Sequence, residues 1–192
     1  MDYLSERREI LNRKIELQFP SAKFISMAKL PFSIASYPEE IITGIHMQIL
    51  GSMRGNALLV FPKKSAFALV DILIGPLIEE NLDSPTEIGI SALKEMGNVV
   101  ISAYLSTLTA FTGVSAFAST VNLTSGAVKY LVNLAFAGLN ATKKIDAVLI
   151  EAVFKEKKRE ISGNFFIIFD AKSMKTILHK AKSLLHEKKE KK

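Results

Sequence analysis

The stretch "GSMRGNALLVFPKKSAFALVDIL", Gly51 to Leu73, decides the fold because the chain contains a second version of it. That second stretch, "KREISGNFFIIFDAKSMKTILHKA", begins at Lys158, and its Gly163-Asn164 matches Gly55-Asn56 at an offset of 163 − 55 = 108 residues. At the same offset three further pairs are identical: Phe61 and Phe169, Lys64 and Lys172, Ser65 and Ser173. A match at one fixed offset indicates an internal duplication.

Both copies have the same pattern of apolar residues. A Gly-Asn turn is expected to open a short apolar strand, residues 57–61 or 165–169, and apolar residues at helical spacing follow it. Another strand precedes each Gly-Asn pair, at 41–50 and 146–154, so each copy predicts a hairpin, with "KEKKRE" at 155–160 as the second turn. The predicted fold class is α+β with pseudo-two-fold symmetry and long helices, its strands merging into one antiparallel or mixed sheet.

The segment between the copies predicts a long helix. Asp83-Ser84-Pro85 is typical of a helix start, and Gly113 is typical of a helix end, so the helix is expected from Pro85 to about Phe111. A strand over 114–123 and a helix over 125–139 are expected next.

The length of 192 residues suits one domain. Within a single domain over 1–192 we expect two halves joined by a linker and followed by a basic tail: first half 1–75, linker 76–84, second half 85–185, tail 186–192.

Composition excludes several function classes. The chain is 48% hydrophobic and has no Cys, so it can bury a core but has no disulfide, thiolate metal site or Cys nucleophile, which fits a cytoplasmic protein. Its three His residues have no metal-ligand spacing, so no metal site is expected. There is also no phosphate-binding Gly loop and no nucleophile elbow.

The charge pattern bears on partners. Much of the formal net charge of +6 lies in residues 155–160 and 179–192, where Lys is mixed with Glu, so nucleic-acid binding is not expected. The uncharged run from Met96 to Val128 is long enough for a membrane span. Because it contains Asn98, Asn122 and several Gly, Ser and Thr residues, a buried amphipathic helix followed by a strand explains it better.

A polar stripe follows the predicted long helix. Ser91, Glu95, Asn98 and Ser102 are spaced by 4, 3 and 4 residues, which places them on one side of a helix. Apolar residues from Ile88 to Phe111 are expected to form a broad apolar face on the other side. A surface helix needs a polar side, so the spacing alone does not indicate chemistry.

The amino-acid sequence of this helix also resembles that of a known protein family. "SALKEMGNVVISAYLSTLTAFTG" resembles the second signature helix of the CheC/CheX/FliY family of response-regulator phosphatases, whose pattern is Asp or Ser, three residues, Glu, two residues, Asn. Here those positions are Ser91, Glu95 and Asn98. The segments "LNRKIELQFP" and "PEEIITGIHMQILGSMRGNALLVFP" also resemble the family, so nearly the whole chain is covered, most like CheC with only the second signature helix.

The sequence departs from the family pattern in two places. Ser5, Glu9 and Asn12 repeat the motif spacing, but Pro20 follows only 20 − 12 = 8 residues after Asn12, too soon for a long helix. We therefore interpret this match as coincidental and expect the true first motif upstream of Met1. The family also has a Pro twenty-three residues after the motif Asn, where this chain has Val121.

The resemblance implies a protein aspartyl-phosphate phosphatase of chemotaxis signalling, acting on a phosphorylated CheY-like response regulator. Asn98 would orient the attacking water, Glu95 would dock on the regulator's lysine, and Ser91 and Ser102 would contact the partner. The chain itself would bind no cofactor, and Mg²⁺ would sit on the regulator.

Two alternatives stay open. The chain could be a structural part of a rotor, like the FliM middle domain, or a non-catalytic adaptor that binds a CheY-like regulator or a CheD-like deamidase. In the family, the helix matching residues 125–139 contacts CheD.

Overall fold

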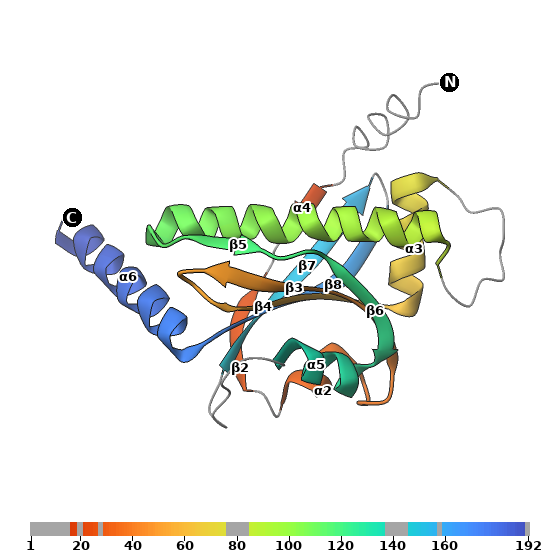
Figure 1. The fold of residues 1–192 in the computed structure, drawn as a ribbon, viewed down its shortest axis with the longest axis horizontal. Coiled ribbons are helices and arrows are strands. Elements are labelled where there is room, and N and C mark those ends of the chain that lie inside the picture. Colours follow the sequence, from red (N-terminus) through yellow and green to blue (C-terminus); the bar gives the residue numbers. More distant parts are fainter. Residues whose placement is uncertain are drawn as a thin grey trace, which may run out of the picture.

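The computed structural model describes residues 16–18, 21–26, 29–75, 85–136, 146–156 and 159–190. Within these ranges the strands form one eight-stranded sheet with helices on both faces (Figure 1). The elements are β1 (Glu16–Gln18), β2 (Ala22–Ser26), α2 (Leu30–Ile34), β3 (Ile41–Gly51), β4 (Gly55–Pro62), α3 (Lys63–Ile74), α4 (Glu87–Thr112), β5 (Ala116–Ala118), β6 (Asn122–Ala127), α5 (Val128–Phe136), β7 (Asp146–Glu156), β8 (Arg159–Phe169) and α6 (Ala171–Glu190).

The sheet interleaves the two halves of the chain. Its order is β1-β7-β8-β4-β3-β5, with β2 also paired to β7 and β6 also paired to β3. Strands β1 and β2 therefore flank the hairpin of the second half, while β5 and β6 flank the hairpin of the first half. Each described strand pair is antiparallel, which confirms the α+β class and the antiparallel version of the predicted sheet.

The pairing of β4 with β8 shows the pseudo-two-fold symmetry. Leu58 is the register partner of Phe166, and 166 − 58 = 108 is the offset of the sequence repeat. A residue that pairs with its own repeat counterpart marks the axis, so the duplicated hairpins meet at the centre of the sheet.

The Gly-Asn pairs are not turns. Gly163 lies inside β8, and a Cβ there would be 2.5 Å from Cε1 of the Phe61 ring, while Gly55 opens β4 directly against the backbone of Ile168. Both glycines are needed because another chain segment approaches closely. The first hairpin turns before Gly55, where Gly51 has a φ of 109°.

The predicted second turn is nearly correct. Strands β7 and β8 pair as far as Glu156 and Arg159, so the outer residues of "KEKKRE" belong to the ladder.

The segment after the long helix differs from prediction. The expected strand over 114–123 is two short strands, β5 and β6, and residues 125–127 belong to β6, so the helix expected from Ser125 begins at Val128. Residues 125–127 extend the strand and do not start the helix, because they can pair with the edge of β3. Ser125 lies opposite Thr43, and the two hydroxyl oxygens are 3.1 Å apart. The expected helix end at Leu139 lies outside the described residues.

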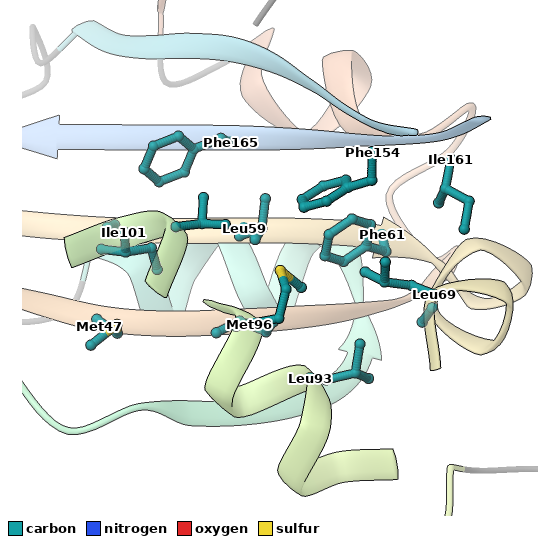
Figure 2. Close-up of a cluster of buried hydrophobic side chains, with 14 of the residues drawn as sticks. Met47, Leu59, Phe61, Leu69, Leu93, Met96, Ile101, Phe154, Ile161 and Phe165 are labelled. Atoms are coloured by element: carbon teal, nitrogen blue, oxygen red, sulfur yellow. The ribbon is translucent and has the colours of Figure 1, made fainter. Parts of the chain in front are cut away.

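Two apolar cores fill the two faces of the sheet. Helices α3 and α4 pack on one face, and α2 and α5 pack on the other (Figure 1). Figure 2 shows Leu93, Met96 and Ile101 of α4 pointing into the larger core, which also contains aromatic residues from three strands: Phe61, Phe154 and Phe165. None of the described helices combines the length and apolar character needed to cross a bilayer.

Candidate functional site

The candidate site lies on α4, whose two ends are fixed by local chemistry. Thr86 caps the N-terminus, its Oγ1 accepting a hydrogen bond of 3.2 Å from the Gly89 amide. At the other end, Gly113 has a left-handed φ of 71°, which glycine adopts without strain. The predicted helix from Pro85 to about Phe111, stopping at Gly113, is therefore confirmed to within two residues.

A close contact with the sheet sets the rotation of α4 about its axis. A Cβ at Gly97 would lie 2.5 Å from Ile45 Cγ2, so position 97 faces β3. Because successive helical residues turn by about 100°, Asn98 lies on the flank of the helix and Glu95 about 200° away from Gly97, toward solvent. The sheet contact thus turns the Glu-Asn pair outward.

The four residues singled out in the sequence share this outward side. Ser91 and Glu95 are exposed, whereas Asn98 and Ser102 are half-buried. The Ser102 hydroxyl donates to Asn98 Oδ1 at 3.3 Å. Among the described residues, neither the Glu95 carboxylate nor the Asn98 Nδ2 group has a hydrogen-bond or ion-pair partner. The site therefore presents a carboxylate without a partner among the described residues, and a carboxamide whose oxygen already accepts one hydrogen bond.

The apolar face of α4 is narrower than predicted. Ile88 and Val99 are exposed over 63% and 54% of their surfaces, and Phe111 over 41%, although the sequence pattern assigns them to the buried side. Val99, like Glu95, lies about 200° from Gly97. Once Gly97 is known to be the contact residue, the same helical arithmetic identifies Ile88 and Val99 as apolar neighbours of the polar pair.

These groups define the chemistry that α4 can offer. A carboxamide donates and accepts hydrogen bonds without carrying charge, so Asn98 can hold a water molecule or a phosphoryl oxygen. The Glu95 carboxylate can accept hydrogen bonds from an ammonium or guanidinium group. Within the described part of the chain, no three or more His, Asp or Glu side chains are grouped to hold a metal ion.

A second polar cluster lies on the opposite face of the sheet. His46 Nε2 is 3.3 Å from Asn56 Oδ1, and Asn56 Nδ2 donates to the Ala135 carbonyl at 2.8 Å. Burial lowers the pKa of His46, and the hydrogen bond to Asn56 opposes this in part. Since this cluster is buried and connects the sheet to α5, we interpret it as structural.

The structure describes one of the two places where the sequence departs from the family pattern. Ser5, Glu9 and Asn12 lie outside the described residues. Val121 lies between β5 and β6 and packs, half-buried, against the larger core beneath α4.

Comparison with known proteins supplies independent findings. No protein family model matches the chain. Its sequence is 24% identical over 183 residues to the CheY-P phosphatase CheC of Bacillus subtilis (strain 168), covering 90% of this chain and 83% of that protein.

Solved structures with the same fold include Thermotoga maritima FliY, with a TM-score of 0.65 and 18% identity, covering 92% of this chain and 86% of that one. The FliM middle domain of Vibrio alginolyticus has a TM-score of 0.60 and 12% identity, covering 90% of this chain and 88% of that one. At these identities the structural likeness establishes the fold.

Proposed function

The chain belongs to the CheC/CheX/FliY family, and from this premise we propose that it hydrolyses the aspartyl phosphate of a phosphorylated CheY-like response regulator. The observation that carries the proposal is the outward placement of Glu95 and Asn98, one turn apart on α4. Support also comes from the similarity to a protein that is itself a CheY-P phosphatase.

The helix is a stiff support for this pair. It has 26 residues, and Leu93, Met96 and Val100 are buried directly behind the two polar side chains. A group that must reach into a partner's active site works best when the element that carries it is held by packing. The contact of Gly97 with Ile45 supplies a fixed depth and rotation.

The two side chains divide the task between them. Hydrolysis of an acyl phosphate needs a water in line with the bond that breaks, and positioning supplies much of the catalysis. In the proposed complex, the Asn98 carboxamide orients that water. Glu95 accepts hydrogen bonds from a lysine of the regulator, because a carboxylate placed against the phosphoryl group itself would repel it.

Other residues on the exposed side of α4 complete the proposed contact with the partner. Ser91 borders the contact one turn before Glu95, and Ile88 and Val99 add apolar area that becomes buried on docking. Mg²⁺ belongs to the regulator in this proposal, and the chain binds no cofactor of its own. The reaction is a cytoplasmic one, since response regulators act there.

A non-catalytic role is the alternative, because the FliM middle domain has the same fold. A structural member of the fold would also carry polar residues on the exposed side of this helix, but it would not need Ser91, Glu95 and Asn98 at the spacing of the phosphatase signature. This observation favours the phosphatase. Binding of a CheD-like deamidase through α5 is compatible with either role and stays a separate proposal.

The decisive measurement is the decay of a phosphorylated CheY-like regulator with Mg²⁺ and catalytic amounts of the chain. We expect the wild type to accelerate decay and Asn98→Ala to lose about 10²-fold of that acceleration, as loss of positioning does. Glu95→Ala should weaken binding about tenfold, as loss of a charge-assisted hydrogen bond does.

The matched control is Ser106→Ala, an exposed position on the same helix. It should behave as wild type. If the wild type leaves the decay of cognate regulators unchanged, the enzymatic proposal is wrong and the non-catalytic role replaces it.

A further inference from the structure

We infer that Ser102 is a positioning residue: its hydroxyl fixes which end of the Asn98 carboxamide faces the partner. Ser102 follows Asn98 by one helical turn, and its Oγ donates to Asn98 Oδ1 at 3.3 Å. Helical side chains lean toward the N-terminus, so the Ser102 hydroxyl naturally reaches back over Asn98. The inference rests on the proposed function and gives this serine a role that differs from direct partner contact.

The target of this hydroxyl sets it apart from other hydroxyls in the described helices. Ser and Thr in helices commonly donate to the backbone carbonyl four residues earlier. On α4, Thr107 donates in this way to Ala103 and Thr112 to Leu108. The same bond is made on other helices by Ser33, Thr176 and Ser183. Ser102 instead donates to a side chain, and that side chain belongs to the candidate catalytic asparagine.

This hydrogen bond selects between two states of the carboxamide. The terminal torsion of an asparagine is broad and roughly two-fold, so rotation by about 180° exchanges its oxygen and its nitrogen. A hydroxyl that donates to Oδ1 stabilises one of the two states. The Nδ2 hydrogens and the second lone pair of Oδ1 then remain for a water or phosphoryl oxygen.

The burial of the two residues fits an indirect role. Ser102 and Asn98 are half-buried, whereas Ser91, Glu95 and Val99 are exposed on the same side of α4. A partner docked on the exposed residues meets the Asn98 side chain, and Ser102 lies one helical turn further along α4. Removing the hydroxyl should therefore change catalysis more than binding.

The experiment compares Ser102→Ala, Ser102→Thr and the control Ser106→Ala, with turnover of a phosphorylated CheY-like regulator as the first readout. We expect Ser102→Ala to lower kcat about fivefold, the factor that one net hydrogen bond typically contributes, with KM changed less than twofold. Ser102→Thr keeps the hydroxyl and should restore kcat. Ser106→Ala should leave both constants unchanged.

The second readout is independent of activity. NMR relaxation of the Asn98 side-chain amide, in the free protein, should show larger motion in Ser102→Ala than in the wild type, the Thr variant or the control. Unchanged amide motion, or a kcat equal to wild type in Ser102→Ala, overturns the inference while the proposed function stands. If amide motion increases but the wild type has no phosphatase activity, the proposed function fails, and the catalytic role of Ser102 fails with it.

Discussion

Gly97 of α4 lies against Ile45 of β3 so closely that a Cβ at position 97 would be 2.5 Å from Ile45 Cγ2. This contact decides which side of α4 faces the sheet, and therefore where Glu95 and Asn98 point. The glycine belongs to the site in this sense, although it is buried and has no side chain.

Gly97→Ala tests that relationship. Overpacking costs about 1–3 kcal/mol, and the higher helix propensity of alanine returns about 1 kcal/mol, so we expect a net loss of about 0–2 kcal/mol in the free energy of unfolding. Urea unfolding measures it. In a double-mutant cycle with Ile45→Ala, which removes the atom in closest contact, the two losses should sum to more than the loss of the double variant. A Gly97→Ala variant more stable than wild type would show that the contact is loose.

Val99→Asp tests the exposed apolar border of the site. Because Val99 is 54% exposed, we expect the free energy of unfolding to change by no more than about 0.5 kcal/mol. Affinity for the regulator should fall about tenfold, since a charge is buried without a partner on docking. The chain has no Cys, so one cysteine introduced at the exposed Lys172 on α6 can carry a fluorophore for the titration. Unchanged affinity would remove Val99 from the proposed interface.

Asp170→Ala tests an asymmetry between the two copies of the repeat. Asp170 Oδ1 accepts a hydrogen bond of 2.7 Å from the Ser173 amide at the start of α6, whereas Pro62, at the equivalent position before α3, makes no side-chain cap bond. Losing a cap of this kind costs about 1 kcal/mol. Thermal unfolding should show that loss for Asp170→Ala and a smaller one for Asp170→Asn, which keeps the oxygen. Equal losses for both variants would mean that the charge matters more than the hydrogen bond.

The sequence predicts the parts of this fold that depend on local chemistry. The ends of α4 follow from the residues around Pro85 and from Gly113, and the hairpins follow from a repeat that the β4–β8 register reproduces. The sequence predicts a turn at Gly163 because Gly-Asn pairs are typical of turns, but glycine serves close approaches equally well. Only the position of the Phe61 ring, distant in sequence, decides between the two.

The candidate site shows the same limit. Helical spacing brings Ser91, Glu95, Asn98 and Ser102 to one side of α4, as predicted. Spacing does not tell whether the Ser102 hydroxyl donates to a backbone carbonyl or to Asn98. Nor does it tell that Ile88 and Val99 face solvent, because that depends on which residue of α4 touches the sheet.

His46 should make stability depend on pH. Burial lowers its pKa in the folded protein below the ordinary value of 6.5, so the unfolded chain binds more protons as pH falls. The contribution of His46 is fully present above pH 6.5 and is lost progressively below it, down to the folded pKa. We expect the urea midpoint to fall between pH 7.5 and 5.5, and to fall less in His46→Gln, which does not titrate but can still donate to Asn56. Parallel pH profiles for the two proteins would show that His46 does not control this loss of stability.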